Sequence, residues 1–117
     1  MIKRTSLPRL VDISDAIDSA QDILGGADFG TYEKSAITRL AIERCLEIIS
    51  EASRHLPDEL TAQFPHIPWS EIRGIGNVLR HEYFDVQNLV IWRTARNELP
   101  KLKPVIQAMI DQVNKQA

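Results

Sequence analysis

The sequence of 117 residues has little of what secreted, zinc-bound or membrane-spanning proteins are built on. Its single cysteine, Cys45, excludes an internal disulfide framework and a zinc site made of several cysteines. Six prolines and five glycines are too few for a disordered or fibrous chain. No stretch approaches the roughly 20 uninterrupted apolar residues of a membrane span, and no apolar run follows the basic N-terminal residues. We therefore expect a cytoplasmic protein that does not associate with membranes.

The chain also has no excess of positive charge, with 14 Lys and Arg against 16 Asp and Glu. A protein that coats nucleic acid by bulk attraction is strongly basic, so the composition argues against this class. The charges are unevenly distributed. Residues 1–60 hold 7 basic and 11 acidic residues, whereas residues 61–117 hold 7 and 5. We therefore expect an anionic ligand to favour the second half.

Apolar residues recur at helical spacing almost throughout, and no stretch has the alternation of a convincing strand. In the first half we expect a helix over 7–24 ended by Gly25 and Gly26, a polar loop over 27–31, and a helix over 36–52 ended by Pro57. A connector over 58–68 has room for one or two helical turns, and a helix begins at about Pro68. Asp85 is the expected N-cap of the next helix, and a C-terminal helix over 102–113 continues or kinks from that helix past Pro100 and Pro104. We predict an all-α, up-and-down antiparallel bundle of four to five helices, forming a single domain over residues 1–117.

Two glycines, Gly74 and Gly76, lie inside the helix expected from Pro68. Each costs about 1 kcal/mol relative to alanine in a helix interior. Glycines in such positions are typical of a close approach by another backbone, from the same chain or from a partner.

The same helix carries a polar face on which Arg73, Asn77 and His81 recur at i, i+4 and i+8, flanked by Arg80 and Tyr83. An imidazole that titrates near neutral pH, beside cationic and amide donors, can perform general acid–base chemistry on a phosphodiester. RNA supplies its own nucleophile in the 2′-hydroxyl, so such a site needs no metal. The alternative is a polar packing face on which His81 caps backbone carbonyls.

Other chemistry-bearing residues give weaker signals. Glu51 is a candidate to orient Arg73 or His81 across the bundle, although an exposed helix carboxylate is the commoner case. We expect His55 and His66 to be structural, and Cys45 to be a small core residue. No second histidine follows at the spacing of a zinc protease, and no glycine-rich phosphate loop occurs. We therefore expect neither a metal nor a cofactor.

The stretch Pro68-Trp69-x-x-Ile72-x-Gly74-x-x-Asn77-x-Leu79-x-His81-x-Tyr83 resembles the signature of HepT-like proteins, a branch of the HEPN superfamily of helical bundles. The segment Ile48-Ile49-Ser50-Glu51-Ala52 is similar to that family's Ile-Gly-Glu-Ala segment, with Ser50 in place of glycine. The Leu99-Pro100-x-Leu102 turn also looks familial. The resemblance covers roughly residues 7–112.

The resemblance implies a metal-independent RNase toxin whose partner is a minimal nucleotidyltransferase antitoxin. The family's catalytic motif is an arginine, then four to six residues, then a histidine, with a tyrosine two positions later. His81 and Tyr83 match the motif, and Tyr83 is then the side chain that the antitoxin modifies with AMP. The arginine position before Asn77 holds Gly76 instead. Arg73, by its helical facing, or Arg80, by the reach of its side chain, is then the candidate for the phosphate cation, although neither reproduces the motif.

Two interpretations therefore stay open. In the first, a homodimer places two His81-bearing faces on either side of an RNA cleft, with Asn77 as an orienting donor and Gly74 and Gly76 allowing the close helix approach. In the second, Gly76 marks a catalytically degenerate binding module, which keeps the nucleotidyltransferase partner and holds a nucleotide or a protein loop without cleaving RNA.

Overall fold

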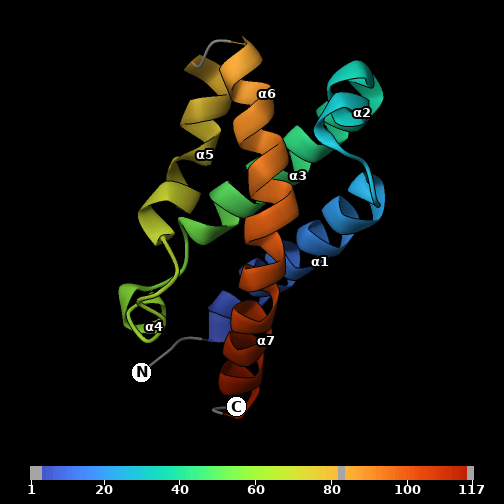
Figure 1. Cartoon of the computed structure of the whole chain (residues 1–117). Helices are drawn as coiled ribbons and strands as arrows, with labels where there is room; N and C mark the ends of the chain where they lie inside the picture. Colours follow the sequence, from blue (N-terminus) through green and yellow to red (C-terminus); the bar gives the residue numbers. More distant parts are fainter. Residues whose placement is uncertain (1–3, 82–83, 116–117) are drawn as a thin grey trace.

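The computed structural model describes residues 4–81 and 84–115, and describes only the backbone of residues 4, 81 and 84–86. All elements within these ranges are helical, and no strand occurs in them, which confirms the predicted all-α class. In chain order they are η1 (Arg4–Ser6), α1 (Leu7–Leu24), α2 (Phe29–Lys34), α3 (Ala36–Ser53), α4 (Asp58–Thr61), α5 (Trp69–His81), α6 (Phe84–Arg93), the π-helical segment η2 (Thr94–Glu98) and α7 (Leu99–Lys115) (Figure 1).

Helices α1 and α3 pack side by side and run in opposite directions (Figure 1). Helix α1 has Pro8 in its first turn, where the missing N–H has no helical partner to lose. It ends at Gly25, whose φ of 52° lies in the region that favours glycine. Both helices bury an apolar stripe that is at most 1% exposed: Leu10, Ile13 and Ile17 on α1, and Ile42, Leu46 and Ile49 on α3. This pair forms the centre of the core.

The loop expected over residues 27–31 is partly wrong, because α2 begins at Phe29. The carboxylate of Asp28 caps this helix by accepting a hydrogen bond from Thr31 N at 2.8 Å, and that bond lowers the pKa of Asp28. Tyr32 from α2 is fully buried. A six-residue helix is too short to display an apolar period, so the sequence pattern did not reveal it.

Helices α6 and α7 are joined through η2 into one continuous helical rod over residues 84–115 (Figure 1). The C-terminal segment thus continues from the preceding helix, one of the two outcomes expected, and Pro104 lies inside α7. The prediction that Asp85 is an N-cap is wrong, since α6 is already helical at Phe84. At the start of η2, Thr94 Oγ1 donates to Val90 O at 2.8 Å, a side-chain bond that accompanies the wider turn.

Helix α5 packs against α3 and runs opposite to α6 (Figure 1). The expected helical turn after Pro57 is present as α4, and α5 begins at Trp69, directly after Pro68, as predicted. Trp69 Nε1 donates to Phe64 O at 3.1 Å and fixes this start. Near the other end, Gln87 Nε2 of α6 donates to Leu79 O at 3.2 Å. These contacts hold both ends of α5, which packs along α3.

Candidate functional site

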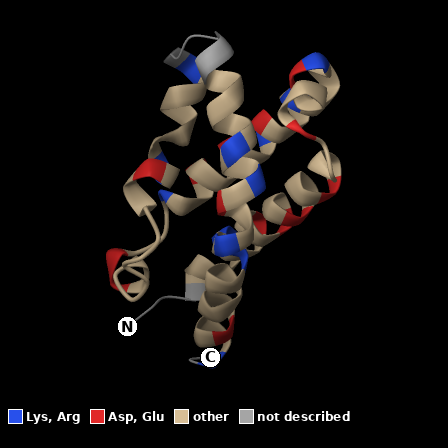
Figure 2. Ribbon diagram, in the orientation of Figure 1, with Lys and Arg blue, Asp and Glu red and all other residues tan. Residues whose placement is uncertain are grey.

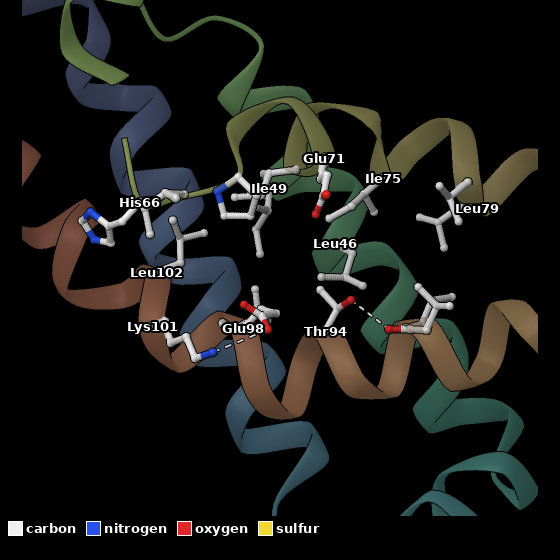
Figure 3. A pocket seen from close by; sticks show the side chains of 17 residues that line it. Leu46, Ile49, His66, Glu71, Ile75, Leu79, Thr94, Glu98, Lys101 and Leu102 are labelled. Atoms are coloured by element: carbon white, nitrogen blue, oxygen red, sulfur yellow. Dashed lines mark hydrogen bonds and ion pairs between the residues drawn. The ribbon is translucent and has the colours of Figure 1, made fainter. Parts of the chain in front are cut away.

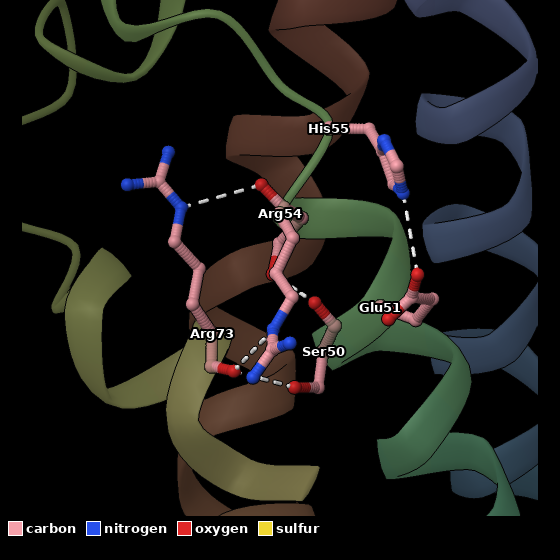
Figure 4. A network of polar contacts seen from close by, with 6 residues as sticks. Ser50, Glu51, Arg54, His55 and Arg73 are labelled. Carbon is pink, nitrogen blue, oxygen red and sulfur yellow. Dashed lines mark hydrogen bonds and ion pairs between the residues drawn. The ribbon is translucent and has the colours of Figure 1, made fainter.

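The hydroxyl of Ser50 joins α3 to α5. Ser50 Oγ donates to Arg73 O at 2.8 Å and accepts from Gly76 N at 3.3 Å, and Ser50 is only 3% exposed (Figure 4). A Cβ atom on Gly76 would lie 3.6 Å from this hydroxyl, which is ordinary van der Waals contact. The close approach at Gly76 is therefore made by a side chain of α3. Apart from the adjoining residues and the backbone of α5 itself, no described atom lies within 4 Å of a Cβ built on Gly74, so no other described helix approaches that glycine.

The guanidinium of Arg73 is directed toward the C-terminal end of α3. Its Nε donates to Ser53 O at 3.3 Å (Figure 4). Its Nη2 lies 3.9 Å from the exposed carboxylate of Asp58 at the start of α4. Long helical side chains lean toward the N-terminus of their helix, so this arginine points away from His81. Arg73 thus ties α3, α4 and α5 together.

Arg80 lies at the other end of the polar face, and its guanidinium is folded back over Gly76. Nη1 of Arg80 is 3.5 Å from the position that a Cβ atom of Gly76 would occupy. Of the two arginines singled out in the sequence, Arg80 is thus the one whose charge lies at position 76.

A polar pocket of about 190 Å³ opens between α3 and α5 at this point. Its lining residues are Arg44, Glu47, Ser50, Glu51, Arg54, Gly76 and Arg80. Sequence reasoning missed the two arginines of α3, because the polar side of that helix is typical of a solvated face. A signal was present: Arg44, Glu47, Glu51 and Arg54 are spaced by three, four and three residues, which places them on one stripe.

Glu51 lines the same pocket as Arg80, and its carboxylate lies 3.2 Å from His55 Nε2 (Figure 4). It is therefore on the α3 face that meets α5, but it contacts His55 and not the guanidinium of Arg73. Both side chains are largely exposed, at 65% for Glu51 and 47% for His55, so this ion pair is worth little in stability.

Two of the remaining predicted site residues, Asn77 and His81, lie on the C-terminal half of α5. Asn77 is exposed on this helix, in line with the backbone of His81, which is the last described residue of α5. Only the backbone of His81 is described, and Tyr83 lies outside the described residues. The structure thus brings Arg80, Gly76 and Glu51 to one pocket, and it directs Arg73 elsewhere.

A second, apolar groove of about 510 Å³ lies between α5 and the α6–α7 rod (Figure 3). Its walls include Ile72, Ile75 and Leu79 on α5 and Val90 and Leu102 on the rod, above a floor of Leu46 and Ile49 from α3. The three α5 side chains are only half-buried, and Val90 is 45% exposed. Helix α5 therefore leaves much of its apolar stripe uncovered within one chain.

The other candidates occupy structural positions. Cys45 is a core residue, as predicted, and burial raises the pKa of its thiol. His66 lies at the edge of the Phe64 ring, 6.4 Å between centroids. Over residues 4–81 and 84–115, no three His, Cys, Asp or Glu side chains gather to hold a metal ion. None of the helices described in those ranges is long and apolar enough to cross a bilayer.

Comparison with known proteins identifies the family. A family model described as "Ribonuclease HepT-like" matches residues 13–109. The "Probable ribonuclease HepT" of Thermococcus cleftensis is 34% identical over 102 residues, 87% of this chain and 93% of that protein. Two proteins of Methanocaldococcus jannaschii are also similar. "Putative RNase MJ1380" is 31% identical over 107 residues, 92% of this chain and 98% of that protein.

The other, "Putative RNase MJ0125", is 33% identical over 110 residues, which is 94% of this chain and 95% of that protein. No solved structure matches the chain. The resemblance inferred from the α5 signature is thus confirmed over most of the sequence, and the chain belongs to the HepT-like ribonuclease family.

Proposed function

We propose that this chain is a cytoplasmic ribonuclease toxin that cleaves RNA without a metal ion. His81 is the general acid–base, Arg80 holds the phosphate, and Asn77 orients it. The observation that carries the proposal is the guanidinium of Arg80 at position 76, where the family motif has its arginine. The similarity to named ribonucleases over 87% or more of the chain supports the class of activity.

The chemistry requires one proton to be removed and one to be supplied. The 2′-hydroxyl oxygen attacks the adjacent phosphorus and gives its proton to a neutral imidazole of His81. The bond from phosphorus to the 5′-oxygen breaks, and that oxygen takes a proton from an imidazolium. The products are a 2′,3′-cyclic phosphate and a free 5′-hydroxyl. Both forms are available because the ordinary pKa of an imidazole lies near neutral pH.

Arg80 is preferred over Arg73 as the cation because of where each guanidinium lies. Arg73 is held by Ser53 O and by Asp58, at the opposite end of the helix from His81. Arg80 immediately precedes His81 and lines an open pocket. A guanidinium placed beside the developing phosphorane charge stabilises it through two parallel N–H donors.

Regulation by a minimal nucleotidyltransferase antitoxin is part of the proposal. The antitoxin would transfer AMP to Tyr83, adding bulk and negative charge two residues from His81. Mass spectrometry after co-expression should find AMP on Tyr83 and none on a Tyr83→Phe variant. Unmodified Tyr83 in the presence of active antitoxin would remove this part.

A homodimer completes the proposed site. The apolar groove supports it, because Ile72, Ile75 and Leu79 on α5 are only half-buried in a single chain. A second copy would cover this face and bring a second His81 across an RNA-sized cleft. Analytical ultracentrifugation should give a dimer, and Ile75→Glu, which charges the groove, should give a monomer.

The competing function is a binding module that has lost catalysis, and Gly76 at the motif position favours it. Such a protein would retain the nucleotidyltransferase partner and hold a nucleotide or a protein loop in the polar pocket. A Gly76→Arg variant tests this reading, since a Cβ at position 76 makes only ordinary contacts. Cleavage that appears only in Gly76→Arg would establish the degenerate module.

The deciding experiment compares wild type with His81→Ala. Each chain is expressed without an antitoxin, growth is followed, and RNA is incubated with the purified protein in EDTA. We expect wild type to arrest growth and cleave RNA, and His81→Ala to do neither. If both leave RNA intact and growth unaffected, the nuclease proposal fails.

A further inference from the structure

The polar pocket extends beyond Arg80 onto α3, where Arg44 and Arg54 line it from the opposite wall. Arg44 and Arg54 are ten residues apart, or about 15 Å along a helix, with Ser50 between them. Across from Ser50 stand Gly76 and the guanidinium of Arg80. Three arginines from two helices therefore line one opening of about 190 Å³.

The present partners of the two α3 arginines leave them able to bind a ligand. Arg44 pairs only loosely with Glu47, at 3.7 Å between Nη1 and Oε2, with the side chains 69% and 50% exposed. Such an exposed pair is worth little and is readily exchanged for a phosphate. Arg54 donates from Nε to Arg73 O at 3.2 Å, a bond that fixes the plane of its guanidinium (Figure 4). A planar guanidinium held in this way presents its Nη atoms as a fork that matches a phosphate.

The two glutamates of the pocket limit what it accepts. Glu51 already pairs with His55 at 3.2 Å, and Glu47 is the partner of Arg44. Three arginines against two glutamates leave the pocket with a small excess of positive charge. This excess is enough to bind a phosphate that displaces Glu47, but it is too small to attract nucleic acid non-specifically. Elsewhere, exposed aspartates follow one another along α1 (Figure 2): Asp12, Asp15, Asp18 and Asp22. Asp18 is paired with Lys103 at 2.9 Å, and the other three carboxylates disfavour a polyanion along α1.

We infer that Arg44 and Arg54 of α3 form, with Arg80, a subsite for a backbone phosphate of RNA next to the one that is cleaved. The inference rests on the proposed ribonuclease function and adds to it the path of the substrate. Arg80 precedes His81 in α5, so a strand whose scissile phosphate is at His81 passes the mouth of the pocket. The α3 arginines are binding residues and hold the strand without touching the reacting atoms.

The test uses an oligoribonucleotide in which every 2′-hydroxyl is methylated, because it binds but has no nucleophile to react. Its affinity is measured by fluorescence anisotropy over a range of salt concentrations, for wild type and for Arg44→Gln/Arg54→Gln. We expect the double variant to bind at least tenfold more weakly. Its slope of log K against log salt should be smaller by about 1.4, as expected for two lost contacts to a single strand.

The matched control is Lys34→Gln/Lys115→Gln, which removes two positive charges at exposed positions outside the pocket. Its affinity should stay within about twofold of wild type, and its salt slope should be unchanged. Arg44→Gln alone guards against a folding effect, since the ion pair of Arg44 with Glu47 is exposed and worth little in stability. Equal losses in the control and the pocket variant, or no loss in either, would overturn the inference. The inference would also fail if the double variant bound the nucleotidyltransferase more weakly but bound the methylated strand as wild type does.

Cleavage of ordinary RNA then separates the subsite from the ribonuclease proposal. If wild type cleaves RNA, Arg44→Gln/Arg54→Gln should raise KM at least tenfold and leave kcat within about twofold. Unchanged KM would overturn the subsite and leave the ribonuclease intact. Conversely, wild type could bind the methylated strand more tightly than Arg44→Gln/Arg54→Gln does and yet cleave no RNA. That result would support the subsite and overturn the ribonuclease proposal.

Discussion

Nη1 of Arg80 lies 3.5 Å from the point where a Cβ atom of Gly76 would stand. The two residues are four apart on α5 and so share one face. Because long helical side chains lean toward the N-terminus, Arg80 carries its guanidinium back over the glycine. The chain has no arginine at the motif position, but the guanidinium of Arg80, from the next turn of the helix, lies beside that position.

This placement predicts that Arg80 and Arg73 differ in function. Arg80→Ala should lower the cleavage rate at least about a hundredfold with little change in stability, because a transition-state cation is lost. Arg73→Ala should instead reduce the free energy of unfolding by about 1–3 kcal/mol, since its bonds to Ser53 O and Asp58 are structural. Single-turnover cleavage and urea unfolding of both variants measure the difference. The reverse pattern would assign the phosphate to Arg73.

Alanine at either helical glycine should stabilise the chain. A Cβ meets nothing within 4 Å at Gly74 and only ordinary contacts at Gly76, so each variant should gain about 0.5–1 kcal/mol in urea unfolding. Loss of stability in Gly76→Ala alone would mean that Arg80 and Ser50 cannot yield to a methyl group. If Gly74→Ala weakens the dimer, Gly74 is at the interface between copies.

The bridge between α3 and α5 should be measurable through Ser50. Ser50→Ala removes the donor to Arg73 O and the acceptor for Gly76 N, so the free energy of unfolding should fall by about 1–2 kcal/mol. Ser19→Ala on the exposed side of α1 is the control and should stay within about 0.5 kcal/mol of wild type. Equal values for the two variants would show that the bridge contributes nothing to stability.

The thiol of Cys45 should react slowly in the native protein. It is 7% exposed, and burial raises its pKa, so at pH 8 both access and the thiolate fraction are reduced. Alkylation by iodoacetamide at pH 8 should therefore be at least about tenfold slower than in urea, and its rate should go on rising with pH after the rate in urea has levelled off. Equal rates with and without urea would contradict a core position.

Sequence periodicity was sufficient for α1, α3, α5 and the α6–α7 rod, because each carries an apolar stripe long enough to show a helical period. It missed α2, which is only six residues long, and it misplaced the start of α6 at Asp85, where an aspartate is equally compatible with the first turn.

The site was only partly predictable for a different reason. Arg73 and Arg80 are both on the α5 polar side, and spacing along a helix does not say what each guanidinium contacts. The two arginines are distinguished by their contacts in the fold: Arg73 donates to the carbonyl of Ser53, whereas the guanidinium of Arg80 lies over Gly76, which has no side chain. Arg44 and Arg54 look like ordinary solvated residues until α5 is packed against α3.

The central claim is that RNA is cleaved by its own 2′-hydroxyl without a metal, and the chemistry of the new ends tests it most directly. A labelled oligoribonucleotide is incubated with purified wild type in EDTA, beside Arg80→Ala and His81→Ala, and the products are identified by mass spectrometry. We predict 2′,3′-cyclic phosphate and 5′-hydroxyl ends from wild type and only intact substrate from His81→Ala. Cleavage that requires Mg²⁺, or that leaves 3′-hydroxyl and 5′-phosphate ends, would contradict it.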